Sequence, residues 1–461
     1  MAKGRSTASG WLVAALVVMI TLVSTGLWNP FPGLWEWINT SATLADPEPR
    51  WQERLGGKPT GVLTADGYVV VEQRDEVEVR SLSTGARVWN ADADWITVAG
   101  PPGRTVVITG KLLVKGYRVL DPRNGSEIRR NDKAAAVWTW SNAMIEVACR
   151  DAEDCTLTAR EPASGDELWH VDLPGVGFVL FADNPDLPST RPLETDRADD
   201  RLAGAGRMPR YLGFPIDDRL HVVDTAEGEV VRVVKPARYE KVVLAGGRVL
   251  HSEAKTVSAG CELHLVARDA ATGRTVWRRD GYNLGTVSGA ACDQRSEPVG
   301  AGNAVLATRP DGRQVLLDAA DGRELLVAAE GAKIIATDGV RAVVRAKDGK
   351  TLTAYQLGEA EPLWSRKADP KATAAVTRTH ILVFDRNPDR LRVLAPDSGE
   401  PLIEAASEAR VLALVPQGLI MGERRDVGLL MFPGAQFTTP QQPTQAPAGT
   451  DGERRDPRER L

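Results

Sequence analysis

The residue types that most often do chemistry in proteins are scattered along this chain of 461 residues. Histidine, a frequent general base and metal ligand, is dispersed along the sequence at His170, His221, His251, His264 and His380. There is no H-E-x-x-H metal motif, no G-x-S-x-G nucleophile elbow and no G-x-x-x-x-G-K-[ST] phosphate loop. Gly300 and Gly302 lack the strand and helix of a dinucleotide site, and the Asp92/Asp94 pair is of a kind common at strand ends. We therefore expect no catalytic, cofactor-binding or metal-ligating residues.

The strands and turns that must position these side chains are predicted by a recurring sequence pattern, which we call the phrase. It occurs about eight times, usually every 40 residues or so. Each copy reads as a short apolar strand, a turn ending in Gly, and a second strand that often carries Trp. The clearest copies are residues 77–89, 157–169 and 265–277. A fixed period of this length indicates a repeat architecture. Four-stranded units arranged radially make a β-propeller, so we expect an all-β fold.

The turn of each phrase ends in a glycine, which can take the positive φ that such a hairpin needs without a Cβ clash. The seven positions are Gly85, Gly125, Gly165, Gly228, Gly273, Gly322 and Gly399. An aspartate often stands four residues earlier, where it can accept bonds from turn amides, at Asp121, Asp224, Asp269 and Asp318. Four residues after the turn position stand tryptophans that can lie flat between blades, Trp89, Trp169, Trp277 and Trp364. Ala360 replaces the glycine expected before Trp364. We interpret these residues as architecture.

The number of blades is the open point of this fold. Eight turn phrases are followed by three more strands in 409–433, and an early strand near 50–55 can supply a fourth that joins the two chain ends. This makes nine units. Because single-chain propellers rarely exceed eight blades, we predict eight, within a domain that spans residues 49–434.

The phrases resemble the repeat of the quinoprotein-like (PQQ-binding-like) β-propeller superfamily, whose blades carry an Asp-x-x-Thr-Gly-x-x-x-Trp pattern. The resemblance covers most of residues 51–432, whereas the Gly-His and Trp-Asp signatures of WD40 propellers are absent. Relatives in this superfamily include cofactor-dependent dehydrogenases, outer-membrane assembly scaffolds and sensor domains of bacterial kinases. The fold alone therefore does not choose an activity.

The dehydrogenases of the superfamily stack the quinone PQQ between a Trp and a ring formed by two adjacent cysteines, above a calcium-binding acid cluster. Here no two cysteines are adjacent, and the closest pair, Cys149 and Cys155, is six positions apart. The resemblance therefore does not extend to PQQ, and we expect no cofactor. A propeller glycosidase or lyase remains an alternative, because spacing in a repeat fold cannot locate paired carboxylates.

The four cysteines predict two disulfide bonds. Cys149 ends an apolar strand and Cys155 opens the next, so they can face each other across a hairpin. Cys261 and Cys292 fall in loops of the fifth and sixth repeats that should emerge on the same face, where a bond would staple adjacent blades. A four-cysteine zinc site is the alternative, but no C-x-x-C spacing occurs. Paired cysteines favour an exported protein.

The N-terminus predicts a membrane anchor. Residues 11–28 are nearly all apolar and long enough to span most of a bilayer core. Lys3 and Arg5 precede them, so the positive-inside rule leaves residues 1–10 in the cytoplasm and exports the rest, with 29–48 as a linker. A cleavable signal peptide is the alternative, but its best small-residue site, 43–45, lies far beyond the apolar run.

Two segments depart from the repeat. Residues 183–209 interrupt the fourth unit and carry the candidate interaction residues Asp183, Asp186, Arg191, Glu194, Asp196 and Arg197. A long insertion on a rigid scaffold often carries binding, although a tolerated mobile surface loop and a calcium site are alternatives. Residues 435–461 cannot bury a core, and we expect them to be disordered.

These features favour a non-catalytic, membrane-anchored propeller outside the cell that acts as a protein-interaction scaffold, with an envelope protein or a glycan as partner. The alternative is a sensor that binds a small molecule or glycan at the central channel. The net charge of −5 excludes the basic surface typical of nucleic-acid binding. The sequence does not indicate an oligomeric state.

Overall fold

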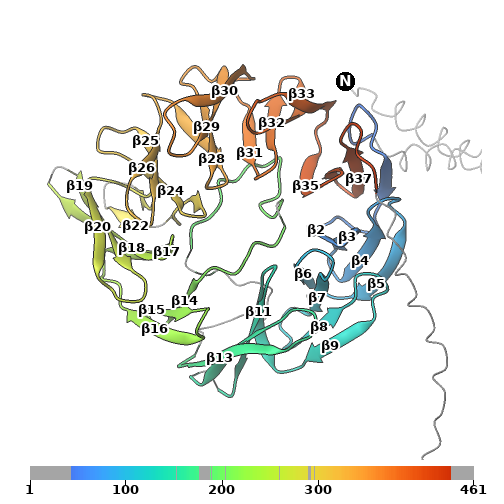
Figure 1. Cartoon of the computed structure of the whole chain (residues 1–461), viewed down its shortest axis with the longest axis horizontal. Coiled ribbons are helices and arrows are strands. Elements are labelled where there is room, and N and C mark those ends of the chain that lie inside the picture. The colour runs from blue at the N-terminus through green and yellow to red at the C-terminus, as the bar shows by residue number, and fades with distance from the viewer. Residues whose placement is uncertain are drawn as a thin grey trace, which may run out of the picture.

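The computed structural model describes residues 43–437, apart from 152, 176–186, 188, 203, 259, 289–291 and 295. Within this part the regular elements are β-strands, which form nine antiparallel sheets arranged around a central axis as a β-propeller (Figure 1). The predicted all-β propeller of four-stranded blades is confirmed. In this part of the chain, no helix is long and apolar enough to cross a membrane. The predicted cytoplasmic tip (1–10) and membrane segment (11–28) lie outside the described residues.

The blades follow one another along the chain, each beginning with its innermost strand. Blade 1 consists of β2 (Gly61–Ala65), β3 (Tyr68–Glu72), β4 (Glu76–Ser81) and β5 (Arg87–Asp92). Blade 2 consists of β6 (Trp95–Ala99), β7 (Val106–Gly110), β8 (Tyr117–Leu120) and β9 (Glu127–Asn131). Blade 3 consists of β10 (Ala134–Thr139), β11 (Met144–Cys149), β12 (Cys155–Arg160) and β13 (Glu167–Leu173). The described strands of blade 4 are β14 (Tyr211–Ile216), β15 (Arg219–Asp224) and β16 (Glu229–Val234).

Blades 5 to 9 complete the ring. Blade 5 consists of β17 (Glu240–Ala245), β18 (Arg248–Val257), β19 (Gly260–Asp269) and β20 (Thr275–Asp280), and blade 6 of β23 (Gly300–Ala301), β24 (Ala304–Thr308), β25 (Gln314–Asp318) and β26 (Glu324–Val327). Blade 7 consists of β27 (Lys333–Thr337), β28 (Arg341–Arg345), β29 (Thr351–Gln356) and β30 (Pro362–Lys367), and blade 8 of β31 (Thr373–Val376), β32 (Ile381–Arg386), β33 (Asp389–Leu394) and β34 (Pro401–Ala406). Blade 9 consists of β35 (Arg410–Val415), β36 (Gly418–Glu423), β37 (Asp426–Met431) and β1 (Trp51–Arg54). A small hairpin, β21 (Val287–Ser288) with β22 (Asp293–Gln294), joins blades 5 and 6.

The prediction of eight blades is wrong, since the described residues form nine. The prediction of eight followed from the rarity of larger rings, although the repeats in the sequence already numbered nine units. Each unit of a repeat fold contacts only its neighbours, so the number of units follows the number of repeats that the sequence supplies. A ninth blade is accommodated by a small change in the angle between neighbours, and it widens the central opening.

The ring closes where the two ends of the described chain meet. β1, from the N-terminal end, pairs antiparallel with β37 and becomes the outer strand of blade 9, with Trp51 opposite Leu429. The prediction that an early strand near 50–55 closes the ring is confirmed. Just before β1, Leu44 and Ala45 are buried in the core of blades 8 and 9, so the end of the predicted linker belongs to the ring.

Five pairs of neighbouring blades are joined by a tryptophan of one blade that lies on the turn glycine of the next. Trp89 in β5 covers Gly125, where an added Cβ would lie 2.8 Å from the indole, and its Nε1–H donates to the Pro122 carbonyl at 2.8 Å. The same stacking and indole bond join Trp51 to Gly85 and Leu82, Trp277 to Gly322 and Ala319, and Trp364 to Gly399 and Pro396. Trp169 lies on Gly228. Since each glycine has a positive φ, both its backbone and its contact exclude a side chain.

Two joints use arginine where the sequence has no tryptophan. Arg129 lies on Gly165 and donates from Nη2 to the Pro162 carbonyl at 3.3 Å, which is equivalent to the carbonyl that Trp89 binds. Arg232 lies on Gly273 in the same way. A planar guanidinium can stack and donate hydrogen bonds at once, so it substitutes for an indole here.

A β-bulge in the outer strand aims each docking residue at its neighbour. In β5 the pairing shifts between Arg87 and Trp89, so that Val88 has no partner on β4. The same shift leaves out Ile128, Leu168, Val276 and Leu402. Bulges bend and twist a strand locally, and here each one precedes the residue that packs on the next blade.

We expect the docking contact to be visible as a difference between two glycine substitutions. Gly322→Ala places a Cβ 2.7 Å from the Trp277 indole at a φ of +76°, which should lower the free energy of unfolding by about 2–5 kcal/mol. Gly67→Ala has a φ of +87° and no atom within 4 Å of the added Cβ, so only about 1–2 kcal/mol should be lost. Urea denaturation measures both, and equal losses would contradict the docking role.

Candidate functional site

The insertion of the fourth unit crosses the middle of the ring. We call residues 187–209 the strap; from the start of blade 4 it runs to the opposite side of the opening and returns to β14 (Figure 1). Its backbone forms parallel bridges from Ser189 to Leu244 of blade 5 and from Ala198 to Val411 of blade 9. Between them, the Arg191 N–H donates to the Pro298 carbonyl at 2.8 Å, and the Arg191 carbonyl accepts from the Gly300 N–H at 2.7 Å. The strap is therefore bonded to several blades around the channel.

Arg197 is the most buried charged side chain among the described residues of the strap, with an exposed fraction of 8%. It donates from Nη1 to Asp389 Oδ1 at 2.9 Å and from Nη2 to the Ser407 carbonyl at 2.6 Å, and its guanidinium lies over the Phe384 ring. Both partners lie in blade 8 or in its connection to blade 9. Arg197 thus fixes the far end of the strap and is a structural residue.

Smaller contacts fix the rest of the strap. Thr195 bonds Thr373 at the start of β31, Asp196 pairs with Arg386, and Arg410 of β35 donates to the Ala198 carbonyl at 3.2 Å. Ala198 and Leu202 are buried with apolar residues of blades 8 and 9. Near the return to β14, Ser141 and Asn142 of blade 3 bond the backbone of Gly206 and Met208.

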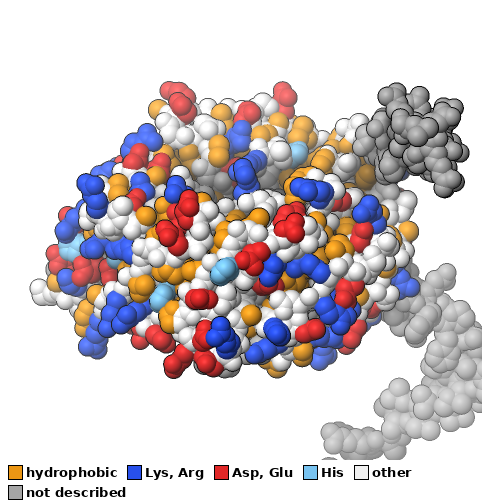
Figure 2. All heavy atoms as spheres, turned by 60° about the horizontal axis from the view of Figure 1, so that its bottom comes forward, with side chains coloured by type: hydrophobic (Ala, Val, Ile, Leu, Met, Phe, Trp, Pro, Cys, Tyr) orange, Lys and Arg blue, Asp and Glu red, His pale blue; other side chains and the backbone are white. Residues whose placement is uncertain are grey.

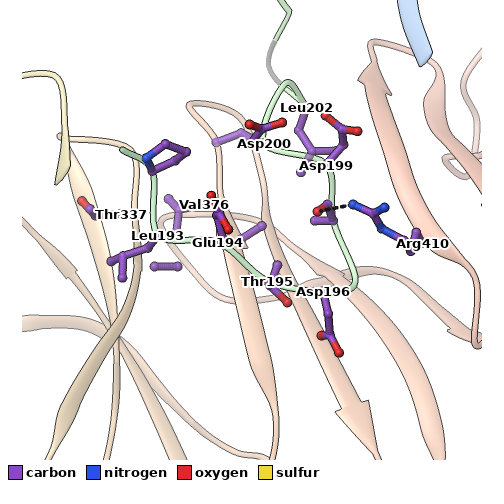
Figure 3. Close-up of a pocket in the computed structure, with 15 residues that line it drawn as sticks. Leu193, Glu194, Thr195, Asp196, Asp199, Asp200, Leu202, Thr337, Val376 and Arg410 are labelled. Carbon is purple, nitrogen blue, oxygen red and sulfur yellow. Dashed lines mark hydrogen bonds between the residues drawn. The ribbon is translucent and has the colours of Figure 1, made fainter. Parts of the chain in front are cut away.

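The strap leaves two cavities in the channel. The first, of about 720 Å³, is lined by the strap together with Thr337, Val376 and Arg410 of blades 7 to 9 (Figure 3). The second, of about 710 Å³, is lined by the strap together with Trp138 and Trp140 of blade 3 and residues of blade 5. Glu194 and Asp200 line both cavities. The strap thus divides the channel into two polar, partly acidic chambers.

The acidic side chains of the strap are held in different ways. Asp199 accepts from the Arg201 amide at 3.0 Å, and its carboxylate lies 3.5 Å from the Arg201 guanidinium. The pKa of Asp200 is raised above the usual aspartate value of 3.8, first because the surrounding protein desolvates the carboxylate and second because Asp199 accepts a hydrogen bond from its protonated form. The strap therefore carries a carboxyl that holds its proton more tightly than an ordinary aspartate.

The predicted interaction residues are divided by this arrangement. Arg191 and Glu194 line the second cavity, whereas Asp196 and Arg197 attach the strap to blade 8. Asp183 and Asp186 lie outside the described residues. The described part of the strap is packed against blades 3, 5, 8 and 9 instead of lying free on the outer surface. Sequence reasoning missed Thr373, Asp389 and Arg410, because no local signal connects them to a segment almost 200 positions away.

The cysteines and histidines lie away from the cavities. Cys149–Cys155 bridges the β11–β12 hairpin, and Cys261–Cys292 joins β19 to the segment before blade 6, so both predicted disulfides are confirmed. The described lining of the two cavities includes no histidine or cysteine. Instead, His170, His251 and His264 each bond a carboxylate within their own blade, and His380 stacks on Phe432.

A protein-family model described as outer membrane protein assembly factor BamB matches residues 153–326 and 261–417, which together are more than half of the chain. The chain belongs to this family. The match confirms the resemblance to the PQQ-like propellers that the repeat phrases indicated. A search of the curated proteins found no significant match.

Solved structures similar to this member of the BamB family include proteins of several kinds. BamB from Moraxella catarrhalis is 15% identical, over 85% of this chain and 99% of that one, with a TM-score of 0.38. A quinohemoprotein alcohol dehydrogenase from Pseudomonas putida is 13% identical, over 88% and 78%, with a TM-score of 0.40. Sqt1 from Saccharomyces cerevisiae is 8% identical, over 85% and 100%, with a TM-score of 0.39. At these values the solved structures carry no functional argument.

Some PQQ-like propellers bind the quinone PQQ, but the residues of this chain differ from those that hold it. Cys149 and Cys155 are bonded across a hairpin and do not form the ring of adjacent cysteines that holds PQQ in the dehydrogenases. Within the described residues, no group of three or more His, Cys, Asp or Glu side chains is arranged to hold a metal ion. The residues described therefore do not fit the quinone.

We expect Arg197 to control the order of the strap. Arg197→Ala leaves Asp389 and the Ser407 carbonyl without this partner, which should cost about 2–3 kcal/mol and speed amide hydrogen exchange across residues 189–202. As the matched control, Asp196→Ala removes only the exposed pair with Arg386 and should cost less than about 1 kcal/mol. Similar exchange in the two variants would contradict the anchoring role.

The raised pKa of Asp200 gives stability a defined pH dependence. A carboxyl whose pKa is higher in the folded than in the unfolded state loses stability as the pH rises from 3.8 through the folded-state pKa. Asp200→Asn removes this loss, so it should raise the Tm slightly at pH 7 and leave it unchanged below pH 3.8. Thermal unfolding at the two pH values tests this; a lower Tm at pH 7 would mean that the charged carboxylate stabilises the strap.

Proposed function

We propose that this BamB-family propeller is a non-catalytic scaffold that binds a protein partner at the outer side of the cell membrane. One observation carries the proposal: the channel, where a propeller would hold a small ligand or a cofactor, is crossed by the chain's own strap, which is bonded to blades 3, 5, 8 and 9. The rigid ring then offers its faces and rim, and repeat scaffolds bind through such extended surfaces.

The surface supports binding to proteins more than to a strongly charged polymer. In Figure 2, basic and acidic side chains are interspersed with apolar ones over the face shown. Mixed charge of this kind suits interfaces whose polar groups are complementary, whereas nucleic acid requires a basic stripe. The name of the matching family, outer membrane protein assembly factor, supports a role in contact with other envelope proteins.

The placement in the envelope rests on the sequence and the disulfides. Both cysteine pairs are bonded, and disulfides persist in oxidising compartments. The apolar segment 11–28 would anchor the chain in the membrane with its N-terminus in the cytoplasm and the propeller outside.

The two channel cavities favour a second candidate, a sensor for a small molecule or glycan. The cavity of about 710 Å³ offers Trp138 and Trp140 together with Glu194, Lys241 and Glu297, and a site that combines aromatic and polar groups is typical of small-ligand recognition. Lys241 and Glu297 are already paired at 2.6 Å, so a ligand would have to compete with that bond.

Purification of the tagged full-length chain from its native envelope in mild detergent tests the two candidates. The scaffold predicts a protein partner at fixed stoichiometry, retained by the double variant Glu194→Gln with Asp200→Asn because both side chains lie in the channel. Loss of the partner in this variant would place its site at the strap. If no protein is bound at fixed stoichiometry and a small molecule is released on denaturation, the scaffold is wrong and the sensor is supported.

A further inference from the structure

The hairpin between β7 and β8 in blade 2 carries the densest group of exposed apolar side chains among the described residues. Leu112, Leu113 and Val114 are consecutive and have exposed fractions of 53%, 70% and 55%. Lys111 and Lys115 flank them in the sequence. Leu113 has a φ of +60°, a left-handed conformation that leucine rarely adopts. Such strain persists only where the surrounding structure holds it, and it is often found at functional sites.

The base of this hairpin is held firmly. Lys111 pairs with Asp92, Leu112 N–H donates to Asp94 Oδ2 at 2.9 Å, and Gly116 N–H donates to the Ala134 carbonyl at 2.8 Å. The connections before and after blade 2 thus fix the turn and leave the three apolar side chains exposed. We call residues 111–115 the tip.

Equivalent turns in other blades show that the fold does not require an apolar tip. The turns between the second and third strands contain Arg74 and Asp75 in blade 1, Asp348 and Gly349 in blade 7, and Arg424 and Arg425 in blade 9. These residues are polar or small, as exposed turns usually are. The apolar tip of blade 2 is therefore a local addition whose role lies outside the ring.

The tip lies on the face at which the described chain begins. Its bonds to Asp94 and Ala134 place it beside the connections between blades. At the connection between blades 8 and 9, Ser407 donates to the Leu44 carbonyl at 2.6 Å. All blades have the same strand order, so these connections emerge on one face. Residues 29–42 are too few to separate residue 43 from the proposed anchor by more than about 50 Å, so this face can meet the bilayer.

We propose that the tip inserts into the membrane surface and docks this face of the propeller on the bilayer. The proposal rests on the proposed membrane location. Three adjacent apolar side chains can enter the boundary between headgroups and acyl chains, while Lys115 remains at the level of the anionic phosphates and Lys111 stays paired with Asp92. One such insertion binds weakly by itself, but a second attachment through the anchor makes it effective and sets the orientation of the ring.

Site-specific fluorescence on the full-length chain tests the proposal. All four cysteines are in disulfides, so Leu113→Cys adds one reactive thiol for an environment-sensitive dye. The matched control is Val340→Cys, an exposed apolar position in the β27–β28 hairpin, on the opposite face. The vesicles consist of phosphatidylethanolamine with a minority of phosphatidylglycerol and contain lipids brominated in their acyl chains. We expect a blue shift and several-fold quenching at position 113 and neither at position 340.

A second experiment tests the role of the tip without a dye attached to the tip itself. A dye at Lys133→Cys, on the connection beside the tip, reports how close this face lies to the lipid. Replacing the tip by Leu112→Ser, Leu113→Gly and Val114→Ser preserves the left-handed position, because glycine tolerates it. Quenching at position 133 should fall in this variant while its thermal unfolding is unchanged; unaltered quenching would overturn the role of the tip.

The other outcomes separate the docking from the anchor. Quenching is measured at saturating lipid, so that it tests the docking of the tip even if the anchor is absent. Resistance of the chain to carbonate extraction from membranes tests the anchor alone. A water-like dye at position 113 on vesicles overturns the docking. A dye at position 113 that is shielded only after an envelope protein is added also overturns it, because the tip would then be a protein contact.

Discussion

The contact between a large flat side chain and a turn glycine holds this ring together. At seven joints between the described blades, an indole or a guanidinium from one blade lies on a turn glycine of the next, and at six of them it also donates a hydrogen bond to a turn carbonyl. The contact requires a residue without Cβ at positive φ on one side and a bulged strand on the other. The joint between blades 9 and 1 has the same form, with Trp51 on Gly85, although its strand comes from the opposite end of the chain. Closure of the ring therefore uses the same contact as most of its other joints.

Ring size and strap are physically connected. Nine blades enclose a wider opening than the smaller rings typical of single-chain propellers, and a wide polar opening would leave the inner strands open to water. The strap occupies this opening and buries Ala198 and Leu202 against blades 8 and 9. Arg197 then bridges to Asp389 and Ser407, which are distant in the sequence. An insertion in blade 4 thereby couples segments on opposite sides of the ring.

In the proposed scaffold, the binding surfaces lie on the outside of the molecule instead of in the central channel. The cavities that remain beside the strap are polar and share the acidic residues Glu194 and Asp200. The most exposed apolar group lies instead on a turn of blade 2, at the face where the chain enters the ring. A propeller held close to a membrane on this face would present its rim and its other face to partners. Family membership is compatible with such a scaffold.

Much of the architecture could be predicted because it depends on residues that are close together in the sequence. Turn glycines need positive φ wherever they occur, Cys149 and Cys155 flank a short hairpin, and a spare strand near 50–55 completes the last blade. Other features arise only in the folded ring. Nothing local distinguishes Arg129 from a surface arginine until Gly165 of the next blade lies beneath it. The number of blades follows the number of repeats, whereas the path of the strap depends on contacts such as Arg197 with Asp389, 192 positions apart. Local turn chemistry and the repeat count thus determined the fold class and the number of units, whereas long-range packing decided the path of the strap across the channel.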